Sequence, residues 1–135
     1  MPIVITQDGR RWAVGNLTRI AQGYALKLFV NDVVPTPLFT ASSFVEASFD
    51  GYSPLLLPAG SGAFIDLNGN ATVTWPGMVF TVGPAGGSDT VYGYFVVGIG
   101  GILLWAERSP GSGTRMEFPG DVFPLVPSFS AGALA

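Results

Sequence analysis

The chain of 135 residues contains neither cysteine nor histidine. Without cysteine it has no disulfides, no thiolate metal ligands and no cysteine nucleophile. Without histidine it lacks the commonest general base, the usual metal ligand and every arrangement that joins serine to histidine and aspartate. An enzyme built from these residues would have to use carboxylates, lysine or tyrosine alone. We therefore predict no enzymatic activity, no cofactor and no metal site.

Charged residues are also scarce. They make up 11% of the chain, against about 25% in an ordinary soluble domain. Hydrophobic residues make up 48% and the mean hydropathy is +0.46. A monomer normally covers itself with charged side chains, so this composition predicts a surface partly covered by neighbouring subunits. A net charge of −3 and a single lysine, Lys27, leave no basic surface for phosphates, and nucleic acid is not expected as a partner.

No membrane segment is expected. Met1 to Thr6 lacks the basic start of a signal peptide. The 17 residues between Asp89 and Glu107 carry no charge, but a spanning helix needs about 20 apolar residues. Glycines interrupt this stretch, and β-branched and aromatic residues dominate it. The pattern therefore predicts a buried β-hairpin, and no membrane partner.

The length predicts one domain, residues 1–135. Nineteen glycines and eleven prolines separate short stretches rich in Val, Phe, Thr, Tyr and Leu. This spacing is typical of a mostly β, single-domain antiparallel sandwich or barrel. The expected strands are residues 24–31, around 47–52, 63–67, 71–75, 78–82, 90–97, 102–107 and 121–126. The strands at 90–97 and 102–107 are apolar on both faces, so neither should meet much water.

One short N-terminal helix is expected at residues 8–19, where Asp8 can cap the first turn. A single helical turn is expected within residues 40–46. Asn68-Gly69 predicts a tight hairpin turn between the strands at 63–67 and 71–75, since both residues tolerate positive φ. The oxygen side chains of residues 66–70 have the spacing of a calcium loop, but the closing glutamate is missing, so the turn is the preferred interpretation.

The nine carboxylates predict structural roles. Asp8, Asp32, Asp50, Asp89 and Asp121 lie beside Gly, Asn or strand ends, where aspartate ordinarily accepts turn hydrogen bonds. Glu107 and Arg108 are expected to form an ion pair at a strand end. The glycines at 98–101 resemble a nucleotide-binding loop, but a strand rather than a helix follows them, so a turn is expected.

Aromatic residues at 13% are the other prominent feature. Tyr92, Tyr94 and Trp105 are expected to pack in the core or at a subunit interface. If they shared an exposed face, they could instead stack on sugars.

The two ends of the chain are predicted to attach to neighbours. An extended arm, residues 1–6, holds the β-prone run Ile3, Val4 and Ile5, and an uncharged tail, residues 128–135, carries Phe129 and Leu134 as its large anchors. An exposed strand edge can accept such segments.

Five stretches, in this order, carry a resemblance: residues 26–35 (LKLFVNDVVP), 44–52 (FVEASFDGY), 91–96 (VYGYFV), 104–108 (LWAER) and 119–127 (PGDVFPLVP). Together they resemble small structural proteins encoded in the particle-assembly regions of tailed bacteriophages. The resemblance implies a virion component, assembled in the host cytoplasm and bound to a major capsid or other virion protein.

With the charge deficit, this resemblance favours a capsid decoration or cement protein that also binds itself, most simply as a trimer. The alternative is a carbohydrate-binding β module on a tail or host-recognition fibre.

Overall fold

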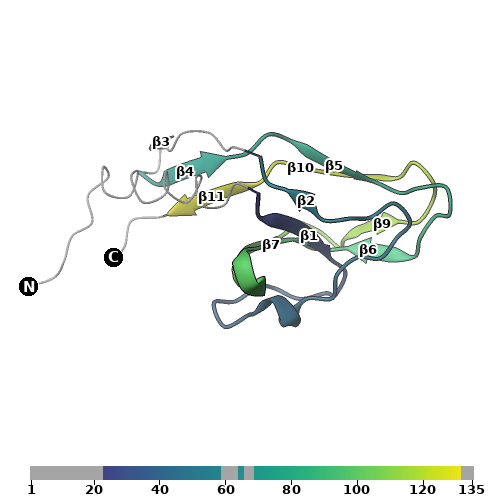
Figure 1. The fold of residues 1–135 in the computed structure, drawn as a ribbon, viewed down its shortest axis with the longest axis horizontal. Coiled ribbons are helices and arrows are strands. Elements are labelled where there is room, and N and C mark those ends of the chain that lie inside the picture. The colour runs from purple at the N-terminus through teal and green to yellow at the C-terminus, as the bar shows by residue number, and fades with distance from the viewer. Residues whose placement is uncertain (1–22, 59–63, 66–68, 132–135) are drawn as a thin grey trace, which may run out of the picture. The chain divides into compact units, whose positions relative to one another are not determined.

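A computed structural model describes residues 23–58, 64–65 and 69–131. Its regular structure is mostly β, in antiparallel sheets, with two short 3₁₀ turns (Figure 1). The expected helix at 8–19 and the arm at 1–6 lie outside the described residues. Contacts divide the chain into two compact units, and each is described by itself. The single domain stays a prediction.

The larger unit comprises residues 24–56 and 78–124. Its main sheet has the strand order β2-β1-β7-β8, with β1 Ala25–Phe29, β2 Leu55–Leu56, β7 Gly93–Val97 and β8 Leu103–Arg108. All neighbours in this sheet are antiparallel. Two ribbons accompany it: β5 Met78–Thr81 with β10 Val122–Leu125, and β6 Asp89–Val91 with β9 Thr114–Met116.

The hairpin expected between Asp89 and Glu107 is confirmed as β7 and β8, joined by the 3₁₀ turn η2 Ile99–Gly101. The expected strand at 90–97 is divided, however. Its first part pairs with β9 and its second with β1 and β8, because the Tyr92 amide donates to Phe29 O at 3.0 Å and the chain changes partner there.

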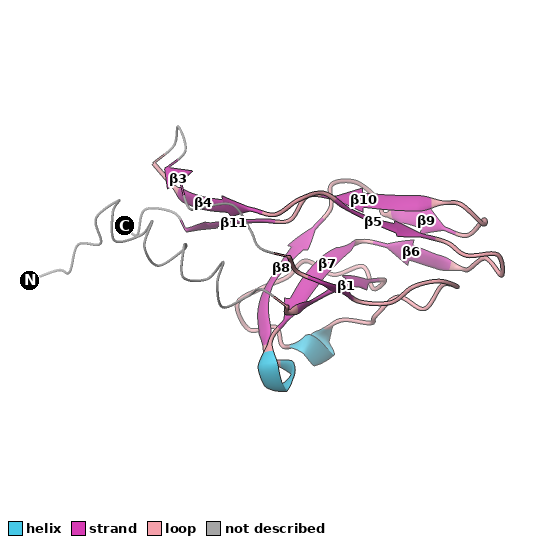
Figure 2. Cartoon of the chain, turned by 45° about the horizontal axis from the view of Figure 1, so that its top comes forward, coloured by secondary structure: helices cyan, strands magenta, loops and turns pink. Residues whose placement is uncertain are grey.

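The two strands of the hairpin also differ in burial, which corrects one expectation. Every residue of β7 is buried, as expected for an interior strand. In β8 every residue but one is half-buried and the remaining one, Glu107, is exposed. Figure 2 shows the cause, since β8 lies on the outer side of β7 at the edge of the sheet. An edge strand lacks one neighbour, so an apolar sequence does not by itself bury it.

Residues 47–52 do not form the expected strand. Only Glu46 makes a bridge to Phe29, after which the chain bends and the Tyr52 side chain turns toward β1. The helical turn expected within 40–46 is confirmed as η1 Ala41–Ser43, where the Thr40 side chain accepts from the Ser43 backbone and the Ser43 hydroxyl from the Thr40 amide.

The smaller unit comprises residues 1–23, 57–77 and 125–135. Its described sheet has the order β11-β4-β3, with β3 Phe64–Ile65, β4 Ala71–Thr74 and β11 Ser128–Ala131. The predicted pairing of these two strands is confirmed, since Phe64 pairs with Thr72 and Ile65 with Ala71. Gly69 has a positive φ of 79°, but Asn68 lies outside the described residues, so the tight turn at Asn68-Gly69 stays a prediction. Much of the predicted tail is not free: residues 128–131 pair with β4 of their own chain.

Candidate interaction surface

A cluster of phenylalanine rings fixes one face of the main sheet. Phe44 stacks on Phe95 of β7 with centroids 4.6 Å apart, and it contacts Phe29 at 4.8 Å. Phe39 adds an edge contact to Phe44 at 5.5 Å. These rings, all buried except the partly buried Phe39, anchor the loop of residues 33–44 to the sheet. The loop therefore presents a fixed wall, even though it has no regular structure beyond η1.

The same loop is tied to the end of β8 through Arg108. The Arg108 guanidinium pairs with Asp32 at 2.6 Å and donates to the Val33 carbonyl at 3.2 Å. It also lies 5.0 Å from the centre of the Tyr92 ring. The expected ion pair of Glu107 with Arg108 is wrong, because successive strand residues point to opposite faces. Glu107 instead accepts the Tyr94 hydroxyl at 3.0 Å.

Between this loop and β8 lies a groove of about 310 Å³, here called the β8 groove. Pro35, Thr36, Pro37 and Phe39 form one wall, and residues 103–106 form the other. None of these eight side chains is charged. Two prolines in the facing wall cannot donate a backbone hydrogen bond to β8. The groove is thus a neutral channel beside a strand edge.

The hydrogen-bond phase of the hairpin shows which backbone groups face away from β7. The Ser109 amide donates to Tyr92 O at 2.8 Å, and the register pairs Tyr94 with Glu107 and Val96 with Trp105. In an antiparallel ladder hydrogen-bonded pairs alternate with non-bonded pairs. The backbone groups of Ala106 and Arg108 therefore point outward, and within the described residues no acceptor is found for the Ala106 amide.

Large hydrophobic side chains are exposed beside the groove and elsewhere. Leu38, in the loop of residues 33–44 (here called the proline loop), is 91% exposed, and Val34 and Ile102 are also exposed. A second group lies on or beside the β5–β10 ribbon, where Val79 and Val122 face outward from their strands. The remaining exposed members among the described residues are Val45, Leu56, Phe118 and Val126. Exposed large apolar side chains that cluster on a surface mark interaction sites.

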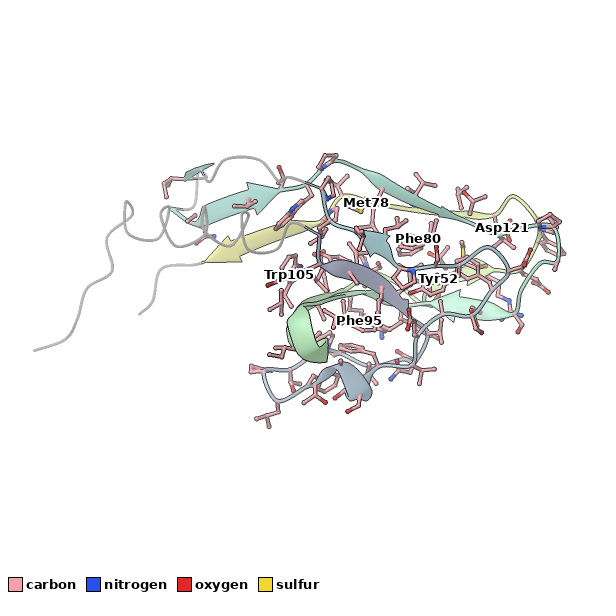
Figure 3. The ribbon with its side chains drawn as sticks, viewed as in Figure 1. Tyr52, Met78, Phe80, Phe95, Trp105 and Asp121 are labelled. Carbon is pink, nitrogen blue, oxygen red and sulfur yellow. The ribbon has the colours of Figure 1, made fainter. Side chains whose placement is uncertain are left out.

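The aromatic residues singled out from the sequence occupy three different settings. Tyr94 is buried, with only 4% of its surface exposed, and the Tyr92 ring lies beneath the Arg108 guanidinium. Trp105 is half-buried and lines the β8 groove. In Figure 3, Trp105 comes from the edge strand, whereas Phe95 belongs to the ring cluster. The three residues therefore form no common exposed platform.

The residues predicted at the chain ends are only partly placed. Ile3, Val4, Ile5 and Leu134 lie outside the described residues, and of Phe129 the structure gives only the backbone, paired with Val73. The proline loop was missed as a binding wall. Its two prolines predict a break in pairing, and only the fold brings that break beside β8.

Three aspartates accept hydrogen bonds from backbone amides. Asp89 accepts from the Ser48 and Phe49 amides at 2.7 and 2.9 Å, and Asp50 from the Ala85 amide at 3.0 Å. Asp121 accepts from the Glu117 and Phe118 amides, and these bonds lower the pKa of its carboxyl. The predicted turn role is confirmed for Asp121, whose bonds lie within residues 117–121. Asp50 and Asp89 instead join segments that are 35 to 41 residues apart in the sequence.

One partly buried polar network involves Tyr52. Its hydroxyl donates to Glu46 at 2.6 Å and accepts the Leu28 amide at 3.2 Å, while Lys27 lies 3.6 Å from Glu46. Burial, and then the Glu46 hydrogen bond, raise the pKa of Tyr52 far above its ordinary value. A phenol held neutral in this way is a poor general base. Its hydroxyl instead gives the Leu28 amide of β1 a hydrogen-bond acceptor.

Among the described residues, no group of three or more acidic side chains could hold a metal ion. Nor does that part of the chain contain a helix long and apolar enough to cross a membrane. Comparison with known proteins found no matching family model, and no curated protein or solved structure matches the chain significantly.

Proposed function

We propose that this chain is a non-enzymatic structural protein of a bacteriophage particle, which decorates or cements the capsid by binding the particle surface and its own neighbours. The ordered resemblance in residues 26–127 supports the phage assignment. The low content of charged residues, 11%, supports the structural role, because such a chain has few charged side chains to cover the surface of a monomer.

The observation that carries the proposal is the exposed apolar surface. Nine large hydrophobic side chains of the described residues are at least half exposed, including Leu38 and Phe118. Isolated apolar side chains on a surface are ordinary, but three of these nine, Val34, Leu38 and Ile102, directly adjoin groove-lining residues in the sequence. Covering them in an assembly would remove apolar surface from water, which is favourable.

The proposed assembly contains several copies of the chain, a trimer being the favoured number, together with a major capsid or other virion protein. We also propose that the strands form the predicted antiparallel β-sandwich or barrel. A closed β-sandwich or barrel would give the rigid subunit that a particle surface requires. The sheet and two ribbons of the larger unit supply strands for such a fold.

The test is the copy number in purified particles of the phage that encodes the chain. Quantitative mass spectrometry against the major capsid protein should find hundreds of copies per particle, and cryo-electron microscopy should place them on the capsid. A handful of copies would point to a tail or fibre instead. Complete absence from purified particles would contradict a virion role.

The second candidate is a carbohydrate-binding module on a fibre. Trp105 favours it, because a half-buried tryptophan in a groove is a suitable surface for a sugar ring. The burial of Tyr94 and the position of Tyr92 under Arg108 disfavour a wider platform. Glycan-array binding that disappears in Trp105→Ala, with folding intact, would favour this candidate over capsid decoration.

A further inference from the structure

The open edge of β8 has defined requirements for a partner. Ala106 and Arg108 direct their backbone groups outward, two residues apart, over the straight part of the strand. The ladder shifts register between Val96 and Val97, so the regular edge covers residues 105–108. An antiparallel partner of three to five residues would satisfy this length, since one strand residue spans about 3.4 Å.

The groove also defines the chemistry of that partner. Its walls carry no charge, and the two charged residues that follow them in β8 already have partners, Glu107 in Tyr94 and Arg108 in Asp32. A charged segment would lose hydration there without gaining a counter-ion. An extended, uncharged, β-branched segment fits best, since its backbone would bond to β8 and alternate side chains would enter the groove.

One segment of this chain meets those requirements. Outside the described residues the sequence comprises 1–22, 59–63, 66–68 and 132–135. The three short segments contain no β-branched residue. Residues 2–6, PIVIT, hold four β-branched residues in succession and no charge. Their proline lies at the outer end, where a missing amide interrupts no ladder.

We propose that the β8 edge of one copy receives residues 2–6 of a second copy as an added strand. This proposal rests on the proposed self-association, and it identifies residues 2–6 as the segment that connects two copies. An edge filled within one chain would join no subunits, whereas exchange of residues 2–6 ties each copy to the next. Pro35 and Pro37 favour an available edge, because neither can donate a backbone hydrogen bond to β8.

Amide hydrogen exchange gives a signature that a merely structural role of residues 1–6 would not produce. In the full chain at assembling concentration, the amides of Ala106 and Arg108 should be protected. In a chain lacking residues 1–6, both should exchange at least tenfold faster. The amides of Trp105 and Glu107 face β7, so their exchange should stay unchanged and report an intact hairpin.

Addition of a synthetic peptide of residues 1–7 to the truncated chain should restore the slow exchange at Ala106 and Arg108. The same peptide with Val4→Pro is the matched control and should not, because proline lacks the amide that the ladder needs. In the full chain, dilution should speed exchange at these two amides, since the strand comes from another molecule.

Three results would overturn the proposal: rapid Ala106 exchange in the full chain, protection that survives the truncation, or protection that is independent of concentration. Rapid exchange would mean that no segment covers the edge. Protection after truncation would mean that another segment covers it, and protection at every concentration would mean that the covering strand comes from the same copy. Sedimentation of the truncated and full chains separates this failure from that of the proposed function. If the chains associate without protecting Ala106, only the proposed strand exchange is wrong. If the full chain stays monomeric, the proposed self-association is wrong as well.

Discussion

The two edges of the main sheet differ in whether their outward-facing backbone groups have hydrogen-bond partners. Beyond the short strand β2, the exposed side of β1 is closed: Leu28 donates its amide to Tyr52 and accepts from Ala47 at 3.1 Å, and the Val30 amide donates to Val45 at 2.8 Å. On the other side, β8 faces a groove with a proline wall. A chain that closes one edge with three separate contacts and leaves the other beside a neutral groove has one edge suited to a partner.

The polar residues follow the same division. Lys27, Glu46 and Tyr52 gather where the edge is closed, while the walls of the β8 groove hold no charged residue. Charge on an edge discourages pairing with another chain. The two charged residues of the β8 edge, Glu107 and Arg108, have partners within the chain, in Tyr94 and Asp32. The comparison therefore predicts that substitutions at the closed edge act on folding, and that substitutions at the open edge act on assembly.

The largest effect on stability is expected at the interior that both edges share. Phe95 is 3% exposed and stacks on Phe44, so Phe95→Ala should lower the free energy of unfolding by about 3–5 kcal/mol. Ile102→Ala, at an exposed position next to the open edge, is the matched control and should cost less than about 0.5 kcal/mol. Urea denaturation measures both. Equal costs would remove the distinction between interior and edge.

At the closed edge, Tyr52→Phe should lower the free energy of unfolding by about 1–3 kcal/mol, because the Leu28 amide loses its acceptor and Glu46 its donor. The wild type should also lose stability as the pH rises above about 10, where the unfolded phenol gives up its proton while the raised pKa keeps the folded one protonated. The variant should lack this part of the alkaline loss. Parallel pH profiles of the two proteins would contradict the role of Tyr52.

At the open edge, Trp105→Ala should lower stability by only about 1–2 kcal/mol, since the side chain is half-buried. Its effect on association should be larger than its effect on folding, because it removes a wall of the β8 groove. Leu104→Ala, a neighbour on the same wall, tests whether apolar area alone matters. Unfolding by denaturant and sedimentation, carried out on the same samples, separate the two effects. A loss as large as that of Phe95→Ala would make Trp105 a core residue.

The sequence predicts the apolar hairpin and its turn well, because β-branched residues and glycines mark them locally. It does not predict which strand lies at the edge. Both strands of the hairpin are apolar, and only their pairing with β1 decides that β7 is interior. The short strands β2 and β9 also escape prediction, since two or three residues such as Leu55–Leu56 carry no periodicity.

The candidate site is predictable only in part. Trp105 is conspicuous from its type and neighbourhood, but the loop Pro35–Phe39 reads as a break in structure rather than as a wall. The Glu107–Arg108 prediction failed for a physical reason: adjacent strand residues face opposite sides of the sheet, so sequence proximity is poor evidence for an ion pair there. Long-range contacts, which no local pattern contains, bring the loop and β8 together.

Sedimentation velocity of the purified full chain, over a series of micromolar concentrations, tests the central claim that its uncovered apolar surface and open edge serve assembly. We expect species heavier than the 14.1 kDa monomer, with a trimer of three times that mass favoured. The heavier species should grow with concentration. A single 14.1 kDa species at every concentration, for a chain that is folded by circular dichroism, would contradict the claim.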